Sequence, residues 1–419
     1  FGSSHFDPSL RSLWVELRRS STKHVILESM EAKDVLILGA VAAAVVAMLP
    51  LGALSTPVAA VLLLLLILVG PMLLAGVKQT VTFLLSMSES KKQTSGRIDG
   101  YTKQFGDDKS TGERNEDYAS LVNDYYDLAT EFYEWGWGTS FHFADRRKGE
   151  SFQQSILRHE YYLAGRLGVN KGSLLLDCGC GIGGPARNMA KFTEASIKAI
   201  TINQFQVDRG NAICKRDGLD DKVQLIQGDF MKLPFPDNHF DGVYAIESTC
   251  HAPDRSKVYS EILRVLKPGG TFACYEWCLT DRYDPENDHH RKIKRDIEVG
   301  DGLPDLVHTS VCTRALGEAG FKVIEARDMA EGGAGEGGEP WYMPLMPSWN
   351  PTKWPRFQFN PPMVRLMPVL LRFFELVRLV PAGTASTQVM LQAGGIGCAQ
   401  GGHTACFTPM WLMVGQKPS

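Results

Sequence analysis

The stretch LLLDCGCGIGGPAR, residues 174–187, decides the fold expected for this chain. An apolar run ends in Asp177 and leads directly into CGCGIGG, after which a helical pattern begins at Pro185. A strand, a glycine-rich turn and a helix start are typical of a nucleotide-binding βαβ unit. The glycine spacing, Gly-x-Gly-x-Gly, differs from the Gly-x-Gly-x-x-Gly of dinucleotide folds. With a carboxylate beside it, this turn suits a cationic ligand that carries an amino acid.

Strand and helix patterns alternate beyond this stretch. Further strands are predicted at 197–202, 223–227, within 234–247, and at 271–277, 321–328 and 407–416, with helices at 185–192, 205–217 and 256–266. The stretch LKPGG, 266–270, is predicted to be a turn. This alternation predicts a doubly wound, mostly parallel α/β sheet of seven strands, which binds ligands at the carboxyl ends of the strands.

Composition excludes several classes of protein. The 419 residues are 44% hydrophobic and 22% charged, a globular balance that argues against disorder. A net charge of −3, no basic stripe and no Asn-Pro-Pro-aromatic motif argue against nucleic acid as a partner. The nine cysteines form no Cys-x-x-Cys pair and accompany no histidine cluster, so no metal site is predicted.

A long uncharged stretch precedes the predicted sheet, from Val35 to Val77. It exceeds the roughly 20 residues that cross a bilayer, and prolines and a glycine interrupt its middle. We therefore expect a membrane anchor, interpreted as a hairpin of helices at 35–49 and 58–77, although the shorter first helix also fits a partly inserted arm. Basic residues on both sides favour a hairpin with both ends in the cytosol.

Two other interpretations of the uncharged stretch are a signal or transit peptide and a buried core helix. A signal segment is shorter, and a core helix rarely avoids charge over such a length. The polar residues that follow are interpreted as a linker. The predicted segments are therefore an N-terminal segment (1–34), the anchor (35–85), the linker (86–117), a core with an N-terminal aromatic cap (118–330), and a C-terminal lid with the last strand (331–419).

The motifs LDCGCGIGG, GDF at 228–230, PFPDNHFD and LKPGG occur in the order of class I S-adenosylmethionine-dependent methyltransferases, which this part of the chain resembles. The resemblance implies S-adenosylmethionine as the cofactor. An acid after the second strand usually holds the ribose, but here the sequence reads TINQFQ. The cofactor-binding residues implied in this way are Asp177, Gly179, Cys180, Gly181 and Gly183, then Asn203 or Gln206 for the ribose, and Asp229 and Phe230 near the adenine.

A narrower resemblance covers the chain from about residue 124 to the C-terminus. YEWGWG at 133–138, YAIESTCHAPD at 244–254, GGTFACYEW at 269–277, GDGLPD at 300–305, EPWYMPL at 339–345 and FTPM at 407–410 resemble motifs of sterol 24-C-methyltransferases. That family methylates carbon 24 of a sterol side-chain double bond. The resemblance implies a role in phytosterol or ergosterol-type biosynthesis, and it suggests a homo-oligomer. The sterol chemistry and the predicted anchor favour the endoplasmic reticulum membrane, facing the cytosol, with a plastid envelope as the alternative.

The implied chemistry explains which side chains are needed. Methyl transfer to the alkene leaves a carbocation at carbon 25, a hydride shift moves the charge to carbon 24, and loss of a proton gives a methylene. Water must be excluded, and aromatic faces stabilise a cation without reacting with it. The predicted aromatic residues are Tyr133, Trp135 and Trp137, although an amphipathic helix that packs on the sheet explains the same pattern.

A weak base must accept the proton. Glu247 and His251, after the fourth strand, and Glu134, in the aromatic motif, are the three alternatives, and the sequence does not choose between them. His142 and Glu276 are weaker alternatives of the same kind.

Nearly eighty residues separate the predicted sixth and seventh strands. An apolar helix at 363–380 fits either a third membrane contact or a lid, and we favour the lid because a long sterol needs a deep apolar site. Two other functions remain open: a methyltransferase for another lipid, such as a phospholipid amine or a quinone, and an inactive membrane-anchored binding module.

Overall fold

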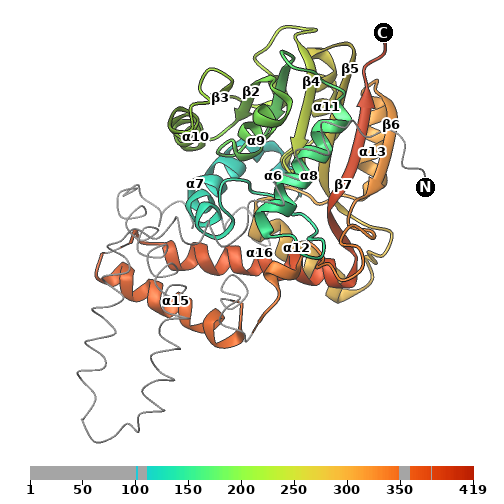
Figure 1. The fold of residues 1–419 in the computed structure, drawn as a ribbon. Coiled ribbons are helices and arrows are strands. Elements are labelled where there is room, and N and C mark those ends of the chain that lie inside the picture. The colour runs from blue at the N-terminus through green and yellow to red at the C-terminus, as the bar shows by residue number, and fades with distance from the viewer. Residues whose placement is uncertain (1–100, 102–110, 349–358, 379) are drawn as a thin grey trace, which may run out of the picture. The chain divides into compact units, whose positions relative to one another are not determined.

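Seven strands form one sheet in the order β3-β2-β1-β4-β5-β7-β6 (Figure 1). The structure is a computed structural model that describes Tyr101 and residues 111–348, 359–378 and 380–419. Only β7 runs antiparallel to its neighbours, between β5 and β6, so the predicted mostly parallel sheet is confirmed. The strands are β1 (Leu174–Cys178), β2 (Ser196–Thr201), β3 (Val223–Gln227), β4 (Phe240–Ile246), β5 (Leu266–Leu279), β6 (Lys322–Asp328) and β7 (Phe407–Gln416).

Helices cover both faces of this sheet because successive strand residues point to opposite sides. Leu175 packs in one apolar core with α8 (Phe152–Leu167), α9 (Gly184–Thr193) and α10 (Gln204–Arg216). Its neighbour Leu176 packs in a second core with α11 (Arg255–Val265) and α13 (Thr309–Glu318). The sheet is thus buried on both sides, and its strand ends are left to form the site.

The predicted linker and the predicted aromatic cap each contain a helix. A short helix, α6 (Thr111–Glu116), lies inside the range predicted as a linker, so the end of that range is helical. The helix α7 (Tyr118–Trp137) carries most of the aromatic motif. Tyr101 is fully buried, its ring centroid lies 5.9 Å from that of Tyr125, and its hydroxyl donates a hydrogen bond to the Val299 carbonyl at 2.6 Å.

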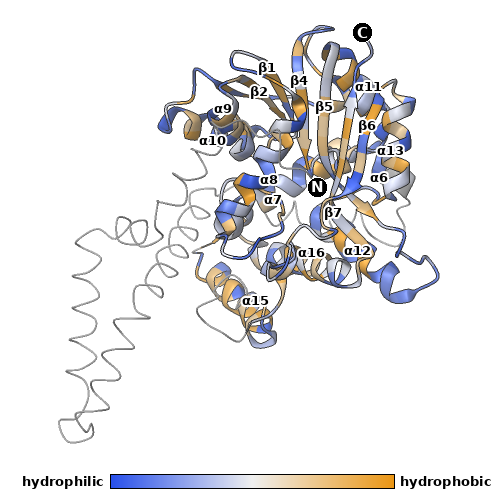
Figure 2. Cartoon of the chain, turned by 45° about the vertical axis from the view of Figure 1, so that its right-hand side comes forward, coloured by the Kyte–Doolittle hydropathy of each residue, from blue (hydrophilic) through white to orange (hydrophobic). Residues whose placement is uncertain are grey.

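The segment between β6 and β7 forms two helices, α15 (Pro361–Leu376) and α16 (Thr384–Thr404). α16 packs closely on α12 (Asp288–Asp301), where a Cβ on Gly300 would lie 2.2 Å from the Cα of Gly394. α15 packs on α16, at the end of the molecule remote from the sheet (Figure 1, Figure 2). The predicted insertion before the last strand is therefore present.

The predicted membrane anchor, 35–77, and the N-terminal segment, 1–34, lie outside the described residues. Among the residues that are described, no helix combines the length and the apolar character needed to cross a membrane.

The predicted turn at LKPGG is wrong, because these residues form the irregular first part of β5. The register shifts there, since Phe240 pairs with Leu266 but Gly242 pairs with Thr271. Backbone bonds to the residue after β7 keep the segment extended: the Gly269 N–H donates to the Lys417 carbonyl, and the Lys417 N–H donates to Gly270.

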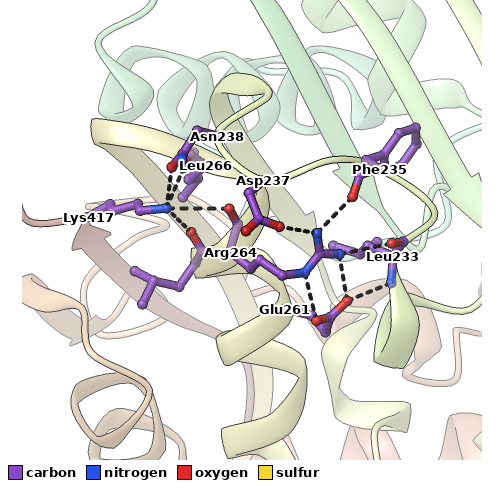
Figure 3. A network of polar contacts seen from close by, with 9 residues as sticks. Leu233, Phe235, Asp237, Asn238, Glu261, Arg264, Leu266 and Lys417 are labelled. Atoms are coloured by element: carbon purple, nitrogen blue, oxygen red, sulfur yellow. Dashed lines mark hydrogen bonds and ion pairs between the residues drawn. The ribbon is translucent and has the colours of Figure 1, made fainter.

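Two cations hold the neighbouring loop in place (Figure 3). The Arg264 guanidinium donates to the Leu233 and Phe235 carbonyls at 3.0 and 2.8 Å and pairs with the carboxylates of Glu261 and Asp237. The Lys417 ammonium donates to the Leu266 carbonyl at 2.7 Å and so ties the end of β7 to the start of β5.

Candidate active site

A pocket opens at the carboxyl ends of the central strands. Its walls come from the glycine turn after β1, the loop after β4, the segment after β3, and α7. The lining residues are Tyr118, Val122, Tyr126, Phe141, His142, Asp177, Gly179, Cys180, Gly181, Pro185, Thr201, Ile202, Gln206, Gly228, Asp229, Phe230, Ile246, Glu247, Ser248 and His251.

The glycine turn brings backbone to the pocket wall where a side chain has no room. Gly179 has φ +84°, and a Cβ there would lie 2.3 Å from the Cβ of Ser248. Gly181 has φ +53°, and its Cβ would lie 3.2 Å from the Phe141 ring. Gly183 does not line the pocket: it caps α9, and its Cβ would meet Leu225 at 3.0 Å. Gly179 and Gly181 thus line the pocket, whereas Gly183 lies outside the lining and caps α9.

Asp177 lies at the floor of the pocket, at the end of β1. It is 2% exposed and accepts a hydrogen bond from the Tyr244 hydroxyl at 3.0 Å. Burial raises the pKa of this carboxyl to about 7, against the opposing effect of the Tyr244 bond.

Of the two residues predicted to bind the ribose, Asn203 and Gln206, only Gln206 lines the pocket. Asn203 caps α10, and its side-chain amide donates to Asp127 of α7 at 2.7 Å, so it lies outside the pocket lining. Gln206 does line the pocket and accepts from the Thr201 hydroxyl at 2.6 Å. Both side chains join α10 to neighbouring elements, but only Gln206 lines the pocket.

Asp229 and Phe230 both line the pocket, after β3. The Asp229 carboxylate accepts a hydrogen bond from the Tyr118 hydroxyl and one from the Met231 N–H at 2.7 Å. Tyr118 therefore joins the first turn of α7 to the strand ends, a contact that the sequence did not indicate.

Glu247 is the most constrained acid of the site. It follows β4 with φ +52°, a left-handed conformation that is uncommon outside glycine. One carboxyl oxygen accepts from the Phe143 N–H at 2.8 Å, and the other accepts from the Trp277 indole N–H at 2.7 Å. Burial raises the pKa of Glu247 to about 8, although these two bonds oppose the rise.

His251 lines the same wall as a neutral ring. Its Nδ1–H donates to the Gly302 carbonyl at 3.1 Å, because a carbonyl can only accept. Its Nε2 then accepts from the Tyr126 hydroxyl at 2.9 Å. These two bonds occupy both ring nitrogens. Burial lowers the pKa of His251 to about 4, which makes the ring a weak base.

The third base predicted from the sequence, Glu134, does not reach the pocket. It forms a bidentate ion pair with Arg209 at 2.6 and 3.0 Å, near the surface. The reason is the helical period, because Glu134 lies on the side of α7 that faces α10 rather than the strand ends.

The predicted aromatic residues lie behind the pocket rather than in its lining. Tyr133 packs 5.4 Å from the Phe141 ring, and its hydroxyl donates to Asp301 at 3.2 Å. Trp137 packs edge-on against Phe143 and donates to the His142 carbonyl at 3.1 Å. Trp135 is partly exposed and also lies outside the lining. The rings that line the pocket are instead Tyr118, Tyr126, Phe141 and Phe230.

Of the two weaker candidates for the base, His142 and Glu276, only His142 lines the pocket. His142 lines the pocket, with Nε2 at 3.1 Å from Glu160 and Nδ1 at 3.0 Å from the Phe143 carbonyl. Burial lowers the pKa of His142, but the bond and charge of Glu160 outweigh this effect and the net pKa is raised. Glu276 is buried behind the wall and bonds to Thr249 and Tyr259.

The predicted lid helix at 363–380 is not part of this pocket, and no described residue of 331–419 lines it. α15 is separated from the site because it packs on α16.

Comparisons with known proteins agree with this geometry. A methyltransferase-domain model matches residues 176–274, and a sterol methyltransferase C-terminal model matches residues 355–419. Cycloartenol-C-24-methyltransferase of Arabidopsis thaliana is 46% identical over 312 residues, which cover 73% of this chain and 89% of the relative. Sterol 24-C-methyltransferase ERG6 of Saccharomyces cerevisiae is 44% identical over 324 residues, covering 74% and 82%. The chain belongs to the sterol 24-C-methyltransferase family.

Solved structures share the fold of this sterol 24-C-methyltransferase family member. The [4+2]-cyclase SpnF has a TM-score of 0.51 and 23% identity, over 71% of this chain and 95% of its own. Geranyl diphosphate C-methyltransferase of Streptomyces coelicolor A3(2) has a TM-score of 0.51 and 15% identity, over 72% and 98%. At such identities the likeness shows the fold alone.

The enzyme is an S-adenosylmethionine-dependent methyltransferase, and the pocket residues fit that cofactor. The backbone at Gly179 and Gly181 offers a close approach that a side chain would block. Asp177 and Glu247 line the pocket, and their carboxyls would suit a ligand that carries an ammonium group and a sulfonium. Asp229, paired with Tyr118, offers an acceptor at the end of β3.

Sequence reasoning missed Tyr118, Tyr126 and Phe141. The sequence does hold a pattern that links two of these residues. Tyr118, Val122 and Tyr126 are spaced by four residues and therefore share one face of α7. The helix carries aromatic residues on several faces, so the spacing alone did not identify which face meets the pocket.

We predict that S-adenosylmethionine binding releases protons near pH 7. The pKa values of Asp177 and Glu247, about 7 and about 8, leave both carboxyls partly protonated there. A cationic ligand favours their charged forms, so binding lowers both pKa values and strengthens as pH rises from about 6 to 8. Calorimetry in two buffers of different ionisation enthalpy measures the release.

Replacement of Glu247 by Gln is expected to reduce the number of protons released and to flatten the pH dependence. Glu134→Gln, the same change outside the pocket, is the control and is expected to leave both unchanged. Net proton uptake, or affinity that does not depend on pH, would contradict the assignment of these carboxyls to the cofactor pocket.

Proposed function

We propose that this enzyme transfers the methyl group of S-adenosylmethionine to carbon 24 of a sterol side-chain double bond, in phytosterol or ergosterol-type sterol biosynthesis. Relatives at 42–46% identity with this activity in their names support the substrate class. The observation in the structure that carries the mechanism is Glu247, a buried carboxyl held by two N–H donors at the wall of an aromatic pocket.

S-adenosylmethionine, when bound, supplies the electrophilic methyl group. The chain must then accept one proton from the sterol cation, and Glu247 is the residue proposed for this step. Both of its hydrogen bonds are accepted from N–H groups, so each oxygen keeps a lone pair for a further proton. Its raised pKa makes the carboxylate a stronger base than an ordinary glutamate.

His251 is the less suitable base because both of its nitrogens are already hydrogen-bonded and its pKa is about 4. We propose a positioning role instead. By accepting from the Tyr126 hydroxyl, His251 fixes the orientation of the Tyr126 ring at the pocket wall.

The cation is proposed to be stabilised by the rings of Tyr126 and Phe141, which line the pocket. Tyr133 packs against Phe141, and Trp137 packs against Phe143, whose N–H holds Glu247. The YEWGWG motif is therefore proposed to support the reacting wall from behind and to exclude water from it.

The uncharged sequence at 35–77 supports a membrane anchor, and the sterol substrate supports a position at the endoplasmic reticulum membrane with the catalytic domain in the cytosol. Alkaline carbonate extraction of the full chain from membranes tests the anchor: retention in the membrane pellet is expected, and release would contradict it. The homo-oligomer suggested by the family resemblance stays a prediction.

The activity is tested by incubating purified enzyme with methyl-labelled S-adenosylmethionine and a panel of sterols that have or lack the side-chain double bond. Mass spectrometry is expected to show a gain of one methylene unit in the unsaturated sterols alone. Cofactor binding without transfer to any sterol would reject the proposed substrate in favour of another lipid acceptor.

In the same assay, Glu247→Gln is expected to lower kcat by about a hundredfold or more, because a positioned general base contributes that much. Cofactor affinity and thermal unfolding are measured alongside, since one N–H donor loses its acceptor in this variant. Glu134→Gln is the matched control, with a kcat close to that of the wild type. An unchanged kcat in Glu247→Gln would remove this residue from the mechanism.

A further inference from the structure

The outer face of α15 is apolar and open to solvent. Figure 2 shows this helix coloured largely as hydrophobic, at the edge of the described structure. Six large apolar side chains of α15 and its C-terminal cap are between 37% and 79% exposed: Leu366, Val369, Leu370, Phe373, Leu376 and Val377.

These six positions form one stripe, because they repeat at intervals of three and four residues. The opposite side of the helix, at Leu371, is 3% exposed and packs inward. A surface helix usually buries its apolar side chains and exposes its polar ones. α15 differs, because most of its large apolar side chains are exposed to solvent. A stripe of this size needs a partner that accepts apolar side chains.

The charges of α15 identify the kind of partner. Arg365 and Arg372 are exposed and seven residues apart, so they share one border of the stripe. The one acidic residue of the helix, Glu375, turns away from it and accepts from the Ala385 N–H of α16 at 2.8 Å. The outward surface thus combines an apolar face with positive charge and no negative charge.

We infer that α15 lies in the surface of a phospholipid bilayer that contains anionic lipid. The apolar stripe would enter the boundary between headgroups and acyl chains, and the two arginines would meet the phosphates. A symmetric contact between two copies fits less well, because it brings two like-charged arginine borders together without an outward acid to pair with them.

This surface goes beyond the proposed anchor, because it is a separate segment of the chain. It gives the catalytic domain a second attachment and a defined orientation on the bilayer. If the proposed sterol activity holds, that orientation would keep the domain beside the phase that contains the substrate.

Depth-dependent fluorescence on the full chain tests the inference. All nine native cysteines are buried, so Phe373→Cys can be labelled selectively with nitrobenzoxadiazole. The matched control is Ile324→Cys, at a 49% exposed apolar residue of β6, remote from α15. Both labelled chains are reconstituted into phosphatidylcholine vesicles with or without phosphatidylserine, so any anchor at 35–77 contributes equally.

The label at 373 is expected to be quenched by nitroxide-labelled lipids and shielded from iodide, whereas the label at 324 shows the reverse. In vesicles with phosphatidylserine, each change of Arg365 or Arg372 to Gln is expected to lower the ratio of inserted to exposed label about fivefold. In vesicles of phosphatidylcholine alone, the same changes have little effect.

Two outcomes would overturn the inference. A label at 373 that iodide reaches freely means that α15 stays in water. A label shielded from iodide but not quenched by lipid means that protein covers the face, either a second copy or another segment of this chain. Because the fluorescence needs no turnover, failure of the sterol assay leaves this result interpretable.

Discussion

The contact between Gly179 and Ser248 is the constraint on which the site depends. Here the turn after β1 meets the loop after β4, so closely that a Cβ on Gly179 would lie 2.3 Å from that of Ser248. The Ser248 hydroxyl donates to the Cys178 carbonyl and closes the contact. Because the two strand ends meet without a side chain between them, the residue before Ser248, Glu247, is carried to the pocket wall beside the glycine turn, with a left-handed backbone.

Burial then gives the site its electrostatic character. Asp177 and Glu247 lie in the same pocket with pKa values of about 7 and about 8, and each is held by neutral donors rather than by an arginine or lysine. Such carboxyls carry a strong preference for a cationic partner, since a positive charge compensates for the water they have lost. The arrangement suits chemistry in which both the methyl donor and the reaction intermediate are cations.

The C-terminal insertion contains the helix predicted as a lid at 363–380, and no described residue of the insertion lines the pocket. α16 packs on α12 through the contact of Gly300 with Gly394 and so completes the wall of the domain, whereas α15 turns its apolar stripe outward. The proposed interfacial surface rests on the orientation of α15 on α16, which leaves the apolar stripe exposed.

The cofactor half could be predicted from the sequence, since LLLDCGCGIGG and the alternation of strands and helices are local signals that depend on neighbouring residues. The sequence also placed Asp177, Gly179, Gly181, Asp229 and Glu247 at strand ends, where the sheet brings them together. The side of α7 that meets the pocket could not be predicted from the sequence, because it depends on contacts with distant parts of the chain. That helix carries aromatic rings on several faces, and its rotation is set by partners more than a hundred residues away: His251 for Tyr126, Asp301 for Tyr133 and Asp229 for Tyr118. Glu134 was for this reason a plausible base in sequence and a surface ion pair in the structure, because helical periodicity fixes which residues share a face but not what that face contacts.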